Sequence, residues 1–173
     1  MNTVQIENRS NEDLPLEFYR ACALFVLEHQ GVRKDAELAI SFVDNDEMQA
    51  LNQQYRNIDA PTDVLSFECD GLDDAFSEVS LTEEAFLDPL EDVVFLLGDV
   101  VIAPSIAHEH SDEFDSTFVE EMSLILIHGI LHLLGYDHDA DDEYAVMRSL
   151  EDELLELWNE QAALLPTVEA SLS

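Results

Sequence analysis

Hydrophobic residues alternate with polar residues in several short stretches of the chain. The alternation is clear in residues 1–9 and again in residues 38–43. It predicts strands that each bury one face. Two more strands are predicted at residues 64–67 and 93–103. We expect a bulge or a close approach of another backbone in the last of these, because Gly98 lies in its middle.

Other stretches repeat their hydrophobic residues with the helical period, namely residues 15–31, 44–55, 115–134 and 141–159. Asp44 and Thr117 each precede a glutamate by three positions, which is the spacing of a helix N-cap and its partner. In the second of these helices Met48, Leu51 and Tyr55 share one face. We therefore expect all three to pack in the core.

The helix predicted at residues 115–134 is apolar around most of its circumference, so it should be buried on nearly all sides. His128 and His132 lie four residues apart and should share one face of this helix. Gly135 can end the helix, and the chain can then bring His138 to the same point. Three imidazoles leave the fourth position of a tetrahedral ion for water, as in catalytic zinc sites.

The histidine spacing equals that of the zinc-protease pattern H-E-x-x-H-x-x-G-x-x-H, with one difference. Gly129 stands where the protease has its catalytic glutamate. Glycine cannot take a proton from water, which argues against peptide hydrolysis. Asp137 precedes a predicted ligand and either orients an imidazole or caps the turn. His108 and His110 are best interpreted as surface residues, with a further metal contact as the alternative.

Composition indicates one domain, because the chain has 173 residues of which 47% are hydrophobic. We expect this domain at residues 1–165, with a solvated acidic excursion at 70–92 and a frayed tail at 166–173. No signal peptide or membrane-spanning run is evident. Cys22 and Cys69 form no CxxC pair, which favours free thiols in a reducing compartment such as the cytoplasm, with a single disulfide as the alternative.

The formal net charge is −34, from 40 acidic and only 6 basic residues. Such a chain has no basic patch of the kind that binds phosphate backbones. Charge alone therefore argues against tight binding of nucleic acid at low salt.

Four blocks of sequence, in order along the chain, resemble the YbeY family of bacterial endoribonucleases. The blocks are Asn52-Gln53-Gln54-Tyr55-Arg56, then Thr62-Asp63-Val64-Leu65-Ser66-Phe67, then Gly98-Asp99-Val100-Val101-Ile102, and finally the stretch from His128 to His138. Met147 and Glu151 also fit the closing pattern of the family. The resemblance covers residues 38–155.

The resemblance implies an α+β fold in which a small mixed sheet of about four strands is packed with helices. It implies one Zn²⁺ per chain, bound by His128, His132 and His138 on the central helix and the turn after it. It implies single-strand-specific RNA cleavage in 16S ribosomal RNA maturation and in ribosome quality control. The important arginine of the family corresponds to Arg56. Expected partners are ribosomal RNA, the small ribosomal subunit, a ribosomal protein and a ribosome-associated GTPase, with no membrane.

Three classes of function remain open from the residues. The first is a zinc-dependent endoribonuclease, in which Arg56 offers its planar guanidinium to a phosphate. The second is a non-catalytic ribosome-assembly factor with a structural metal, which the net charge and the absence of an identified general base favour. The third is a metal hydrolase of another substrate, such as a peptide, which Gly129 argues against.

Overall fold

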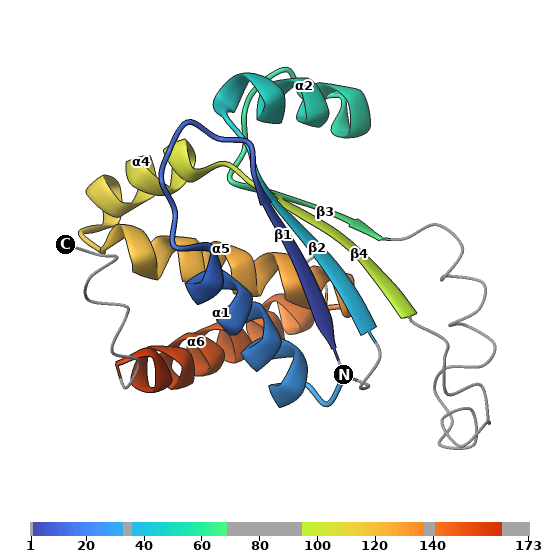
Figure 1. Ribbon diagram of the computed structural model, residues 1–173, viewed down its shortest axis with the longest axis vertical. Helices are drawn as coiled ribbons and strands as arrows, with labels where there is room; N and C mark the ends of the chain where they lie inside the picture. Colours follow the sequence, from blue (N-terminus) through green and yellow to red (C-terminus); the bar gives the residue numbers. More distant parts are fainter. Residues whose placement is uncertain (1, 33–35, 69–94, 137–140, 164–173) are drawn as a thin grey trace.

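A mixed four-stranded sheet in the order β1-β2-β4-β3 forms the centre of the structure (Figure 1). Its strands are β1 (Thr3–Asn8), β2 (Ala36–Phe42), β3 (Val64–Glu68) and β4 (Phe95–Ile102). β1, β2 and β4 are parallel, whereas β3 runs antiparallel to β4. This computed structural model describes residues 2–32, 36–68, 95–136 and 141–163. The prediction of a mixed sheet packed with helices is confirmed.

The helices of the described residues are α1 (Leu16–His29), α2 (Asn45–Arg56), α4 (Pro104–Phe114), α5 (Phe118–Leu133) and α6 (Asp141–Ala162). Figure 1 shows α1, α5 and α6 together on one side of the sheet and α2 away from them, at one end of the strands. The hydrophobic core is divided accordingly. The larger cluster joins the sheet to α1, α5 and α6, and a smaller one joins it to α2.

The burial pattern follows the predicted periods closely. In β2 the side chains of Leu38, Ile40 and Phe42 are fully buried, while the residues between them are only partly buried. Helix α5 contacts α1, α4, α6, β3 and β4, and it is buried around most of its circumference, as predicted. The site residues of α5 therefore belong to a rigid element rather than to a surface helix.

Local signals in the sequence also have their expected structural effects. The Asp44 carboxylate accepts a hydrogen bond from the Glu47 amide at 2.8 Å, and the Thr117 hydroxyl accepts one from the Glu120 amide at 3.1 Å. The bulge in β4 is confirmed by a register shift against β2 and by a φ of 137° at Gly98. Such a φ favours glycine.

Helix α4 fills the stretch between the strand predicted at residues 93–103 and the helix predicted at residues 115–134, where the sequence patterns predict no element. Pro104 occupies the first turn of α4, where its missing N–H costs nothing. The helix was hard to recognise because it buries only a few small side chains, among them Ala107 and Ser111.

Several predictions concern segments outside the described residues, namely the excursion at 70–92, the tail at 166–173 and Cys69. Cys22 is a buried free thiol, and burial raises its pKa. Within the residues that the structure describes, no helix has the length and the apolar character needed to cross a membrane.

Candidate functional site

The two histidines of α5 meet at one point of the structure. The Nε2 atoms of His128 and His132 lie 3.0 Å apart, and the two rings are steeply inclined to each other. The opposite ring nitrogen of His128, Nδ1, is hydrogen-bonded to the carboxylate of Glu151 on α6. A carboxylate at Nδ1 favours the tautomer in which Nδ1 carries the proton, so that Nε2 presents its lone pair.

Glu151 fits the closing pattern of the family, but no place in the candidate site was predicted for it; the structure brings it to His128. Glu151 is only 6% exposed. It lies on the buried face of α6, together with Met147, Leu154 and Trp158. A carboxylate at such a position is costly unless it is paired, and here it pairs with an imidazole of the neighbouring helix. The sequence signal that could have indicated this pairing is a glutamate within the apolar stripe of a helix.

These residues fit a zinc ion. Zinc binds imidazole nitrogen at about 2.0–2.1 Å, so a tetrahedral ion holds two such atoms about 3.3 Å apart, close to the separation seen. The described residues contain no group of three or more metal-ligating side chains. His138, the third predicted ligand, and Asp137, the predicted supporting residue, lie outside the described residues, so their roles remain predictions.

Gly129 lies where α5 approaches the sheet most closely. A Cβ atom at this position would lie 2.8 Å from Val100 Cγ1 and 3.0 Å from Val64 Cγ2. The Ser66 hydroxyl, on β3, donates a hydrogen bond to the Gly129 carbonyl oxygen at 2.9 Å. At the position of the catalytic glutamate of zinc proteases, the space for a side chain is thus occupied here by Val100 and Val64 of the sheet.

We expect Gly129→Ala to lower the free energy of unfolding by about 1–3 kcal/mol, because the new methyl group overlaps two branched side chains. The higher helix propensity of alanine would by itself raise the free energy of unfolding by up to about 1 kcal/mol. The sign of the measured change therefore separates the two effects. Denaturant unfolding measures the difference. In a Val100→Ala background, where the closest overlap is gone, the same substitution should cost less. An equal or larger cost there would contradict the steric explanation.

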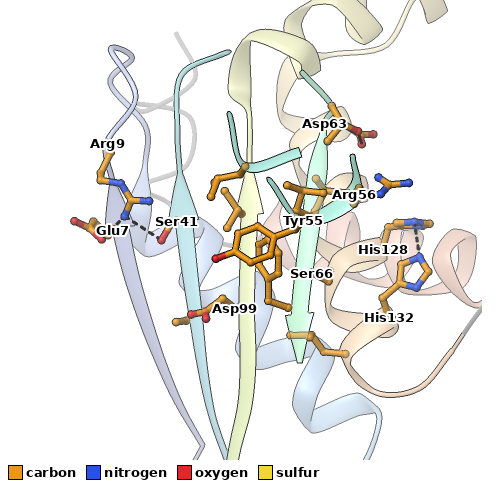
Figure 2. Close-up of a pocket in the computed structure, with 18 residues that line it drawn as sticks. Glu7, Arg9, Ser41, Tyr55, Arg56, Asp63, Ser66, Asp99, His128 and His132 are labelled. Carbon is orange, nitrogen blue, oxygen red and sulfur yellow. Dashed lines mark hydrogen bonds and ion pairs between the residues drawn. The ribbon is translucent and has the colours of Figure 1, made fainter. Parts of the chain in front are cut away.

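A cleft of about 1220 Å³ extends from the histidine pair across the sheet (Figure 2). We call it the sheet cleft. Its polar side chains come from the four strands and the loops beside them, from α2 and from α5, and include Glu7, Arg9, Ser41, Arg56, Asp63, Ser66, Asp99, His128 and His132. The predicted arginine, Arg56, and two of the predicted ligands, His128 and His132, therefore line the same cavity although they are far apart in sequence.

Arg56 is the last residue of α2, and the chain turns sharply after it. Asn57 ends the helix in the left-handed conformation, with a φ of 58°. The buried Asn52 side chain then donates a hydrogen bond to the Ala60 carbonyl oxygen at 2.8 Å, which holds the following loop against the helix. Figure 2 shows Arg56 on the same side of the cleft as His128.

The two arginines of the sheet cleft differ in their charge environment. Arg9 donates to the Glu47 carboxylate at 2.6 Å and to the Glu7 carboxylate at 2.7 Å. The hydrogen bond to Glu47 and the attraction of both carboxylates raise the pKa of Arg9, although burial opposes them. Arg56 is exposed, and among the described residues it has no carboxylate within ion-pair distance. Its charge is thus available to an anion in the cleft.

His108 and His110 lie outside the sheet cleft, on α4. The His108 ring stacks on Phe118, with ring centroids 3.8 Å apart, and its Nε2 contacts the Glu12 carboxylate. His110 packs edge-on against Phe114. These contacts give both histidines structural partners away from the cleft.

The chain is similar to one family of known proteins. A family model described as Endoribonuclease YbeY matches residues 4–159. An endoribonuclease YbeY of Clostridium botulinum is 36% identical over 162 residues, which cover 90% of this chain and 98% of that protein. An endoribonuclease YbeY of a Thermoanaerobacter species is 42% identical over 130 residues, which cover 75% of this chain and 79% of that one.

The fold is also similar to that of a solved structure. The solution structure of a protein from Thermotoga maritima superimposes with a TM-score of 0.55 at 27% sequence identity, over 91% of this chain and 93% of that one. The family model, the two relatives and the solved structure each match most of the chain. The chain belongs to the YbeY family of endoribonucleases.

Proposed function

We propose that this protein is a zinc-dependent endoribonuclease that cleaves single-stranded RNA. The observation that carries the proposal is the meeting of His128, His132 and Arg56 in one cleft, with Glu151 behind the first histidine. Cleavage of a phosphodiester needs a group that binds the phosphate and a group that stabilises developing charge. The sheet cleft supplies candidates for both.

Within this proposal one Zn²⁺ is held by His128 and His132, with His138 as the third ligand. Zinc in such a site would polarise phosphate oxygens as a Lewis acid and lower the pKa of a bound water to about 7. Glu151 holds the His128 ring by its Nδ1 atom, so that Nε2 faces His132. Arg56 offers two parallel N–H donors to the phosphate of the strand.

Membership of the family supports a proposal for the biological setting. We propose that the substrate is ribosomal RNA, with a role in 16S maturation and in ribosome quality control, in the cytoplasm. Partners would then be the small ribosomal subunit, a ribosomal protein and a ribosome-associated GTPase. The names of the relatives support RNA as the substrate. The second candidate, a non-catalytic assembly factor with a structural metal, is favoured by the carboxylates of Asp63 and Asp99, which would repel RNA phosphates in the cleft.

One experiment separates these two functions. The purified protein is analysed for metal and incubated with a single-stranded RNA and with the same sequence in a duplex. A chelator is then used to remove the metal, which is added back in a parallel sample. The enzyme predicts about one zinc per chain, cleavage of the single strand alone, and loss and recovery of cleavage with the metal. Absence of cleavage by protein that carries its metal would favour the assembly factor.

We expect Glu151→Gln to weaken zinc binding by about 10- to 100-fold, because the charged partner of His128 Nδ1 is lost. Titration against a chelator of known affinity measures this without reference to cleavage. Glu153→Gln is the matched control, since Glu153 lies on the same helix and is exposed. Equal zinc affinity in the parent and the Glu151 variant would show that the carboxylate does not support the ligand.

A further inference from the structure

Tyr55 does not pack in the core, and this part of the prediction from helical spacing is wrong. Met48 is fully buried and Leu51 is partly buried, but Tyr55 is 58% exposed. Met48 and Leu51 belong to or pack against the small hydrophobic cluster beneath α2. Tyr55 lies one helical turn after Leu51 and is not covered by this cluster. The ring instead projects into the sheet cleft.

The exposed Tyr55 ring packs against a second aromatic ring. The Phe67 ring on β3 meets it edge-on, with centroids 4.9 Å apart and an interplanar angle of 63°. Edge-to-face pairs of this kind are favourable arrangements of aromatic rings. Figure 2 shows Tyr55 over the middle of the cleft, between Asp99 on one side and Arg56 with the histidines on the other. A large, braced aromatic surface thus lies beside the candidate phosphate-binding residue.

The charges of the cleft limit how it can hold RNA. Arg9 is neutralised by Glu7 and Glu47, and Asp63 and Asp99 add negative charge. Arg56 is therefore the cleft arginine without an ion pair among the described residues. Contacts to several phosphates, the usual source of affinity for RNA, are not available in this part of the molecule. Binding must draw on an interaction that needs no positive charge.

Stacking of a base on an aromatic side chain is such an interaction, and it is tolerant of sequence. A base inside a duplex is already stacked on its neighbours, whereas an unpaired base can offer its face to the protein. We infer that Tyr55, braced by Phe67, stacks on an unpaired base of the RNA strand next to the phosphate that Arg56 binds. This inference rests on the proposed function, and it gives a physical reason for a preference for single strands.

The test compares four proteins that carry their metal: the parent, Tyr55→Leu, Tyr55→Phe and Phe114→Leu. Phe114 is a matched control because it is an aromatic residue that is 65% exposed on α4, outside the cleft. Affinity for a single-stranded oligoribonucleotide is measured by fluorescence anisotropy, and KM and kcat are measured by cleavage. We expect Tyr55→Leu to weaken binding and raise KM about 5- to 100-fold, with a smaller change in kcat. Tyr55→Phe and Phe114→Leu should stay within about 2-fold of the parent.

Two further measurements identify stacking as the cause. The loss caused by Tyr55→Leu should be the same at low and high salt, because stacking releases no counterions. An oligonucleotide in which single abasic sites are placed in turn should bind the parent less well at one position. For the oligonucleotide with its abasic site at that position, Tyr55→Leu should cause no further loss of affinity. A loss in Tyr55→Phe as large as in Tyr55→Leu would assign the effect to the hydroxyl group and overturn the inference.

The outcomes also separate this inference from the proposed function. A parent that binds and cleaves RNA, together with a Tyr55→Leu variant of equal affinity, overturns the stacking role and leaves the enzyme intact. A parent that binds RNA through Tyr55 without cleaving it supports stacking and overturns the enzyme. A parent that neither binds nor cleaves overturns both.

Discussion

Replacing His128 and His132 together by glutamine is expected to remove zinc from the purified protein and to lower RNA cleavage at least about a thousandfold. The two Nε2 atoms lie 3.0 Å apart, and they are the imidazole nitrogens that the described residues bring to the cleft. Lewis-acid stabilisation contributes several kcal/mol to phosphoryl chemistry, and each 1.36 kcal/mol is about tenfold in rate. Elemental analysis and single-turnover cleavage measure the two effects.

The matched control is the double variant His108→Gln/His110→Gln. It removes the same number of imidazoles from α4, where the rings pack on Phe118 and Phe114 outside the cleft. Its zinc content and cleavage should equal those of the parent. Loss of zinc in this control would restore the alternative in which His108 or His110 contacts the metal. Retention of one zinc by the α5 variant would place the metal elsewhere.

Features that depend on neighbouring residues in sequence could be predicted. The caps at Asp44 and Thr117, the alternation in β2 and the bulge near Gly98 all follow from local sterics and hydrogen bonding. The close spacing of His128 and His132 likewise needs only the pitch of one helix. Such features are the same wherever the element lies in the fold.

Features that depend on how elements pack could not be predicted in this way. Glu151 acts on His128 only because α6 lies against α5, and no period within α6 indicates which residue it will meet. Tyr55 occupies the apolar face of α2, yet the cluster that would cover it ends one turn earlier. Gly129 was recognised as the absence of a catalytic glutamate, whereas its structural cause is the contact with Val100 and Val64.

The sequence therefore indicated the candidate metal ligands better than the candidate surface for RNA. Ligands to a small ion must lie within a few ångströms of each other, and a short motif on one helix can meet that need. A surface for a polymer is assembled from several elements: here Tyr55 comes from α2, Phe67 from β3 and Asp99 from β4. The net charge of the chain did not indicate this surface, because Arg56 is the one cleft arginine that makes no ion pair among the described residues.

We expect Arg56→Ala to lower cleavage of single-stranded RNA about 10- to 150-fold, because it removes a charge-assisted hydrogen bond of about 1.5–3 kcal/mol from the phosphate. Arg56→Lys should recover little of this, since an ammonium group cannot form two parallel bonds to one phosphate. Folding and zinc content should not change, because Arg56 is exposed and makes no ion pair among the described residues. Cleavage rates, thermal melts and metal analysis are compared across the variants.

Arg148→Ala is the matched control for charge, because Arg148 is exposed on α6 with only a long contact of 4.0 Å to Asp152. Both alanine variants make the net charge more negative by one, so any general increase in repulsion of RNA is equal in the two. The difference between them therefore measures what Arg56 does at its own position. Full activity in Arg56→Lys would reduce the role of Arg56 to that of a point charge. Equal losses in the two alanine variants would mean that overall charge, and not contact with the phosphate, limits cleavage by this acidic protein.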